Sequence, residues 1–269
     1  MKKLLFASLI CLSLMFSGCV SIHKALANNG RSAPGGQLKG YGMVNEWMTL
    51  TDSNIDYFLK YLSKSGCNMT EIELFGREED QWINNQSKIK DKFDTFIELA
   101  RYYNVIVFVD IANQGDTSII SQPDSFFQGW LNFINDYGPG NMVVQAVGEG
   151  SGSKSQNWYA MTENTLTKFT LSYNMGARPT SAPTRYLYID YHSASIPDIG
   201  PNDSRIMPNT DSGILNEMQN GGVMGQTFIT DKVVQFATPV IAQKRSVNLY
   251  GYYHLSPDKN AMSTLGGIK

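Results

Sequence analysis

Cysteine and clustered positive charge are both scarce in this sequence. Its 269 residues include only three cysteines, and two of them, Cys11 and Cys19, fall within the first 19 residues. The chain therefore lacks the paired cysteines of a disulfide framework. The 22 Lys and Arg residues face 24 Asp and Glu residues, and no segment concentrates the basic ones. Because nucleic acids and acidic membranes attract clustered basic residues, we expect no nucleic-acid partner.

The signatures of several enzyme classes are missing as well. No glycine-rich phosphate-binding motif follows the first predicted strand. Ser151 lies between two glycines, but the segment is not the G-x-S-x-G elbow of serine hydrolases. The histidines that follow predicted strands, His192 and His254, lack the tight spacing of metal ligands. We therefore expect neither a metal nor another cofactor.

Residues 1–18 have the pattern of a targeting segment. Lys2 and Lys3 are followed by an apolar run over residues 4–16, which is too short for a permanent membrane-spanning helix, and then by Ser17-Gly18-Cys19. This pattern resembles the lipobox of a bacterial lipoprotein signal. The resemblance implies cleavage before Cys19, attachment of lipid to Cys19, and a place in the bacterial cell envelope, periplasmic or on the outer surface. An ordinary secretory signal or an uncleaved anchor is the alternative.

The next segment, residues 19–40, is rich in Gly, Asn, Ser and Ala, which predicts a flexible tether between membrane and domain. Residues 41–269 remain for the folded part. With 42% hydrophobic residues, a chain of this length can bury a sizeable core, and one large domain is expected.

Strand and helix patterns alternate along the domain. The first unit is a strand at 41–47, an N-cap at Thr51-Asp52, a helix at 54–65 with its apolar residues on one face, and a stop at Gly66. Further strands are predicted at 69–75, 105–110, 142–147, 186–192, 223–228 and 247–253. Further helices are predicted at 88–103, 126–137, 157–173, 214–219 and 232–244, and residues 193–212 form a long predicted loop.

This alternation predicts an α/β fold of the (β/α)8 TIM-barrel type. Only seven strands are predicted, whereas a closed barrel has eight. Either the barrel is irregular or incomplete, or an eighth strand lies near residues 180–184 or in the tether. A doubly wound open sheet is the alternative fold.

Polar side chains close nearly every predicted strand. In a βα barrel the carboxyl ends of the strands form the functional face, so this pattern favours a polar pocket. Hydrolysis of a glycosidic bond needs two carboxylates, one as acid and one as nucleophile or base. Aromatic residues near the strand ends could stack on sugar rings. The residues in these positions are Glu46, Trp47, Glu73, Asp110, Glu149, Trp158, Asp190, Tyr191, His192, Gln226, Tyr253 and His254.

The strand that ends in Gly148-Glu149-Gly150 resembles the fourth strand of TIM-barrel glycoside hydrolases of the cellulase-like clan. In that clan the acid/base glutamate closes the fourth strand, which implies this role for Glu149. The chain departs from the clan in two ways: Gly148 stands where Asn usually precedes the glutamate, and no Glu ends either of the last two predicted strands.

The resemblance implies a glycoside hydrolase-like lipoprotein that acts on or binds a polysaccharide or oligosaccharide. Glu149 is the expected catalytic acid, with Asp110, Asp190 or Glu46 as the second carboxylate. The other site residues are expected to bind substrate: Glu46, Trp47, Glu73, Trp158, Tyr191, His192, Tyr253 and His254. The alternative is a non-catalytic surface lipoprotein that uses the same face to bind a glycan or a protein.

Overall fold

Eight parallel strands close into a barrel within the described part of the chain. The computed structural model describes residues 37–43, 46–74, 86–113, 123–148, 153–174, 186–192, 206–211, 226–250 and 259–269. The strands are β1 (Lys39–Gly42), β2 (Met69–Glu73), β3 (Ile106–Asn113), β4 (Met142–Gly148), β5 (Thr170–Asn174), β6 (Tyr186–His192), β7 (Ile206–Asp211) and β8 (Val247–Tyr250).

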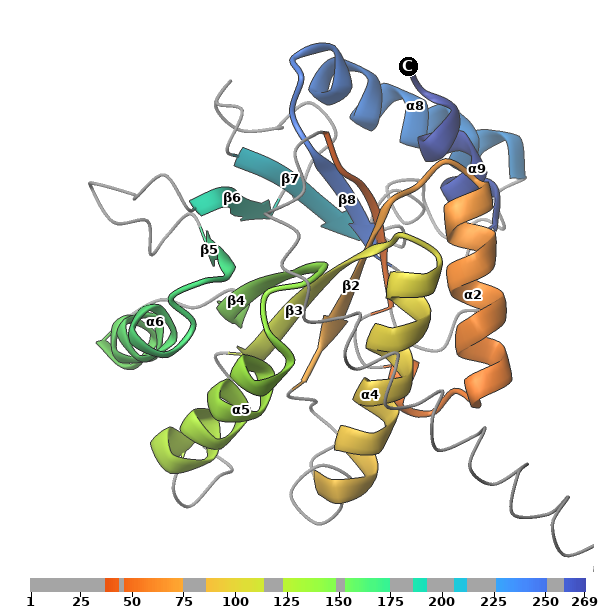
Figure 1. Ribbon diagram of the computed structural model, residues 1–269. Coiled ribbons are helices and arrows are strands. Elements are labelled where there is room, and N and C mark those ends of the chain that lie inside the picture. Colours follow the sequence, from red (N-terminus) through yellow and green to blue (C-terminus); the bar gives the residue numbers. More distant parts are fainter. Residues whose placement is uncertain are drawn as a thin grey trace, which may run out of the picture.

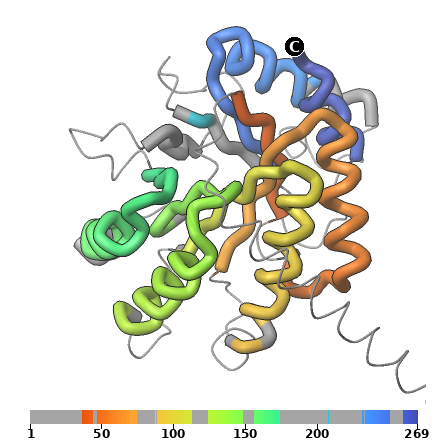
Figure 2. The backbone as a smooth tube through the Cα atoms, viewed as in Figure 1, coloured from red at the N-terminus to blue at the C-terminus, as the bar shows by residue number. Residues whose placement is uncertain are grey.

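Each strand pairs with its neighbours in the sequence, and β1 also pairs with β8. Four register pairs join these two strands, from Lys39 with Val247 to Gly42 with Tyr250. Figure 2 shows the consequence: the red start of the described chain lies beside its blue end. The barrel is therefore closed, and the predicted (β/α)8 fold is confirmed.

Helices surround the strands on the outside (Figure 1). They are the short 3-10 helix η1 (Glu46–Met48), α2 (Asp52–Lys64), α4 (Gln86–Tyr102), α5 (Pro123–Tyr137), α6 (Ser153–Thr165), α8 (Gln226–Ala242) and α9 (Lys259–Gly267). Helix α2 begins as predicted, because the Thr51 side chain accepts a hydrogen bond from the Asn54 backbone N–H. Within the described ranges, none of the helices combines the length and apolar character needed to cross a bilayer.

The sheet buries both of its faces. Outward-facing strand residues such as Val107 and Val109 pack against helix residues such as Phe93 and Ile97 in the main core. Inside the barrel lies a second, smaller cluster, formed by Leu38, Met69, Ile106, Phe108, Val143 and Met207. Burial on both faces explains why β3 and β4 are almost continuous apolar runs in the sequence.

The helix predicted at 157–173 is wrong in its second half. Helix α6 ends at Thr165, and residues 170–174 form strand β5 instead. Leu166 and Phe169 continue the apolar spacing of α6, and the turn between the two elements contains neither Gly nor Pro. The sequence therefore carries no signal for the change from helix to strand.

Two other predictions, for residues 193–212 and 223–228, are corrected by strand β7 and helix α8. The predicted loop 193–212 contains strand β7, which was missed because Pro208 and polar residues interrupt its apolar pattern. The predicted strand 223–228 is wrong where the structure describes it, because α8 begins at Gln226. Its alternating residues imitate a strand, but Val233, Phe236 and Val240 further along bury one helical face.

Candidate functional site

The carboxyl ends of the eight strands meet at one rim of the barrel, because all strands run parallel. Polar side chains approach this rim inside the barrel in a row across four neighbouring strands. Glu73 on β2 is in register with Asp110 on β3, and Asp110 with Gln145 on β4. Gln145 is in register with Ser172 on β5, whose hydroxyl donates to Gln145 Oε1 at 3.0 Å. Neighbouring strands lie about 4.8 Å apart, so Glu73 and Asp110 bring two carboxylates close together.

Burial differs along this polar row. Asp110, Gln145 and Ser172 are buried, whereas Glu73 at the end of β2 is partly exposed. Gln145 Nε2 has no hydrogen-bond partner among the described residues. A row with acceptors, a donor and one exposed end suits recognition of a ligand that carries hydroxyl groups.

A second polar contact crosses the barrel interior lower down. The Asn248 amide on β8 donates to Glu71 Oε2 on β2, and both side chains are buried. Gly40 of β1 lies between them, since a Cβ at that position would lie 2.2 Å from Asn248 Oδ1. The missing side chain at Gly40 therefore lets β2 and β8 interact across β1.

The backbone alone is described for four predicted site residues: Glu46, Asp190, Tyr191 and His192. Glu46 begins η1, directly after the end of β1. Asp190 is in register with Met207, and His192, the last residue of β6, with Asn209. Met207 belongs to the inner cluster, so the alternation of β6 assigns Asp190 and His192 to the inner set of positions.

Trp47 and Trp158 are the predicted site residues that the structure corrects. Both indoles are buried, with 0% and 1% of their surface exposed. Trp47 packs edge-on against Phe93 and Phe96 of α4, and Trp158 stacks on Phe127 of α5 with ring centroids 4.6 Å apart. Trp47 is covered by α4, and Trp158 lies between its own helix α6 and α5, so neither indole is available for sugar stacking as predicted.

Four predicted residues, Cys19, Glu149, Tyr253 and His254, lie outside the described residues. The position before Glu149 is nevertheless clear, because β4 ends at Gly148, which is in register with Asn113 of β3. No group of three or more His, Cys, Asp or Glu side chains in the described ranges is arranged to hold a metal ion.

Several residues of this face are not among those predicted from the sequence. Asp211 ends β7, within the range 193–212 for which the sequence predicts a loop. Gln145 and Asn248 interrupt the apolar runs of β4 and β8, and this interruption was the signal that could have found them. In a strand buried on both faces, a single polar residue indicates an interior contact.

Sequence comparison finds no matching protein family and no curated protein of similar sequence. Solved structures with a similar fold do exist, and several are glycoside hydrolases. A family 5 lichenase from Caldicellulosiruptor sp. F32 has a TM-score of 0.56 and 9% identity, covering 93% of this chain and 94% of its own. The endo-1,4-beta-mannanase from Rhizomucor miehei has a TM-score of 0.54 and 10% identity, with coverages of 87% and 97%.

A family 5 glycoside hydrolase from Bacteroides vulgatus ATCC 8482 is similar over a smaller share of its length. Its TM-score is 0.54 and its identity 11%, and the match covers 80% of this chain but only 58% of that one. At such identities the comparisons establish a shared TIM-barrel fold and no activity, because barrels of this kind carry many different activities.

Proposed function

We propose that this protein is a glycoside hydrolase that cleaves a polysaccharide or oligosaccharide at the carboxyl-end rim of its barrel. The observation that supports this most directly is the order of the strands. Strand β4 ends immediately before Glu149, and β7, three strands further around the barrel, ends on Asp211. Family 5 glycoside hydrolases share the fold.

In this proposal Glu149 is the general acid, and Asp211 joins Asp110, Asp190 and Glu46 as a candidate for the second carboxylate. Asp211 is favoured because it ends a late strand, which is where the clan has its nucleophile. An aspartate is one methylene shorter than that glutamate. The distance between the two carboxyl groups decides the stereochemistry: about 5–5.5 Å implies retention and about 6.5–9.5 Å inversion.

Glu73, the partly exposed end of the polar row, is proposed to hydrogen-bond sugar hydroxyls beside the reacting bond, with Asp110 and Gln145 buried next to it and Tyr191, His192, Tyr253 and His254 completing the rim. We also propose that lipid on Cys19 anchors the protein in the cell envelope. The neighbours' names include a lichenase and a mannanase, so a mixed-linkage β-glucan and a β-1,4-mannan are the first substrates to test.

The test measures release of reducing sugar from both glycans by the full chain and by Glu149→Gln and Asp211→Asn. Loss of a general acid is expected to lower kcat/KM by about 10²–10⁴-fold. The control is Asp136→Asn, an exposed residue near the end of α5, at the opposite end of the barrel. Full activity of Glu149→Gln would refute the assignment, and full activity of Asp211→Asn would return the second role to Asp110, Asp190 or Glu46.

One departure from the clan favours a second candidate function, a barrel that binds glycan without cleaving it. Neither β7 nor β8 ends on a glutamate; they end on Asp211 and Tyr250. Binding of either glycan by the wild type and by Glu149→Gln, with no sugar released by either, would establish this second function.

A further inference from the structure

Two side-chain hydrogen bonds connect the segment between β1 and α2, residues 46–50, to neighbouring elements. It carries Glu46 at its start and follows β1, so it lies at the rim of the barrel. In one hydrogen bond, the Trp47 indole N–H donates to the Glu73 carbonyl at the end of β2. In the other, the Lys92 ammonium of α4 donates to the Leu50 carbonyl. Neither contact is explained by the chemistry proposed above.

Trp47 extends the pairing of β1 with β2 beyond the end of β1. The Glu71 carbonyl accepts the Met43 backbone N–H at 2.9 Å, in the manner of a sheet ladder. In a parallel ladder the next acceptor is two residues further along, and this carbonyl, of Glu73, accepts the Trp47 indole N–H at 2.9 Å. The side chain thus takes the place of a strand donor. Because Phe93 and Phe96 hold the indole edge-on, the Glu73 backbone is held as well.

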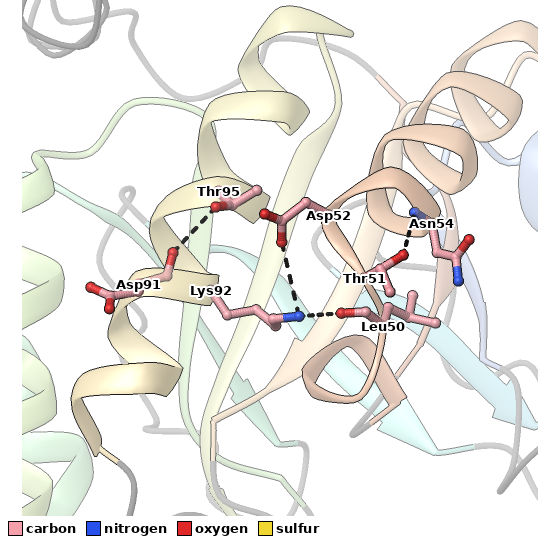
Figure 3. Close-up of polar contacts among 7 residues, drawn as sticks. All are labelled: Leu50, Thr51, Asp52, Asn54, Asp91, Lys92 and Thr95. Carbon is pink, nitrogen blue, oxygen red and sulfur yellow. Dashed lines mark hydrogen bonds and ion pairs between the residues drawn. The ribbon is translucent and has the colours of Figure 1, made fainter. Parts of the chain in front are cut away.

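Lys92 binds the other end of the segment, at Leu50 (Figure 3). Its ammonium donates to the Leu50 carbonyl and lies 3.9 Å from Asp52 Oδ1. The Lys92 side chain is 18% exposed and that of Asp52 71%, so the hydrogen bond to Leu50 is the better shielded of the two contacts. Thr51 caps α2 between these points, which fixes where the segment stops and the helix begins.

We infer that Trp47 and Lys92 are positioning residues that hold Glu46 and Glu73 at the rim in the arrangement that binds glycan. Trp47 acts on both, because it follows Glu46 in the chain and binds the backbone of Glu73. Lys92 prevents residues 46–50 from moving away from α4. Both act through the backbone and touch no substrate. This inference rests on the proposed function, since it assigns these carboxylates to glycan binding.

The test uses the full chain with Lys92→Met, Lys92→Arg and Trp47→Phe. Methionine keeps an unbranched side chain as far as Cε and removes the ammonium with both of its contacts, whereas arginine restores a donor for Leu50. Phenylalanine keeps an aromatic ring against Phe93 and Phe96 and removes only the N–H. The matched control is Lys90→Met, since Lys90 lies on the same helix over the Trp130 and Phe133 rings of α5.

Two readouts are compared: amide hydrogen exchange of residues 46–50, and kcat and KM on the β-glucan and the β-mannan. We expect Lys92→Met and Trp47→Phe to raise exchange of this segment at least tenfold and KM at least threefold, with kcat within twofold of wild type. Lys92→Arg should restore both. Exchange no faster than in Lys90→Met, or faster exchange with unchanged KM, would overturn the inference.

Failure of the proposed function would look different. A wild-type chain that neither binds nor cleaves either glycan refutes that function and the glycan part of this inference together. The exchange rates, which need no substrate, then decide by themselves whether Trp47 and Lys92 hold the segment.

Discussion

Replacing Gly266 by alanine should separate the last helix from the barrel wall. Gly266 in α9 packs against the turn that ends α2, where Gly66 has a φ of +89°. A Cβ at Gly266 would lie 1.9 Å from the Ser65 carbonyl oxygen and 2.7 Å from its carbon. These are backbone atoms, which cannot rotate aside as a side chain does. The helix must shift, and the Lys39 ammonium then loses its 3.3 Å contact with the Gly266 carbonyl.

The size of the effect lies between two limits. Overpacking that the structure absorbs by small shifts costs about 1–3 kcal/mol. Complete undocking would expose Met262 and Leu265, which are buried, at about 1.5–3 kcal/mol for each side chain. We expect Gly266→Ala to lower the free energy of unfolding by about 2–5 kcal/mol, between these limits. At about 2–4 °C per kcal/mol, the Tm should fall by about 4–20 °C.

Urea and thermal unfolding of the full chain, followed by circular dichroism, measure this change. Gly267→Ala is the matched control, since no described atom beyond its chain neighbours and its own helix backbone lies within 4 Å of a Cβ there. That variant should match wild type or gain up to about 1 kcal/mol from helix propensity. If Gly266→Ala stayed within about 0.5 kcal/mol of wild type, the close backbone contact between α9 and α2 would be refuted.

Two further predictions concern other buried and exposed positions. Gly129→Ala in α5 should raise the free energy of unfolding by about 0.5–1 kcal/mol in urea titrations, because a Cβ there meets no described atom beyond its chain neighbours and its own helix backbone, and glycine is unfavourable inside a helix. A loss of stability would contradict this. Burial raises the pKa of Cys67 from 9.0 to about 12, so the folded state holds the thiol proton more tightly than the unfolded state. This contribution to stability is complete below pH 9 and is lost as the pH rises towards 12. Stability measured from pH 8 to 11 should therefore fall less in Cys67→Ala than in wild type, and an equal fall in both would exclude the thiol as the cause.

Local sequence patterns predicted most of the helices and strands in the first half of the barrel. Helices α2, α4 and α5 bury residues spaced by one helical turn, and β3 and β4 are almost continuously apolar, so each could be recognised without its neighbours. Strands β5 and β7 have no such pattern. They are strands because β4, β6 and β8 offer unpaired edges on either side of them, and barrel closure satisfies those edges.

In the candidate site too, some residues could be predicted from local pattern and others depended on the tertiary structure. Asp110 could be recognised as a polar residue in an otherwise apolar strand, but β3 continues past it to Asn113, so Asp110 does not end its strand as predicted. Trp47 and Trp158 could not be assigned to a face, because a tryptophan beside a strand end can point to the cleft or under a helix. Which of the two occurs depended on Phe93, Phe96 and Phe127, which lie on helices elsewhere in the sequence.

By itself the sequence determined that strands and helices alternate, that their carboxyl ends are polar, and that the chain contains too few cysteines for a disulfide framework. Only the tertiary structure decided that the barrel closes with eight strands, that Glu73, Asp110 and Gln145 lie side by side, and that β7 brings Asp211 to the rim. The physical reason is that apolar periodicity is a property of neighbouring residues, whereas register and closure depend on hydrogen bonds between strands far apart in the chain.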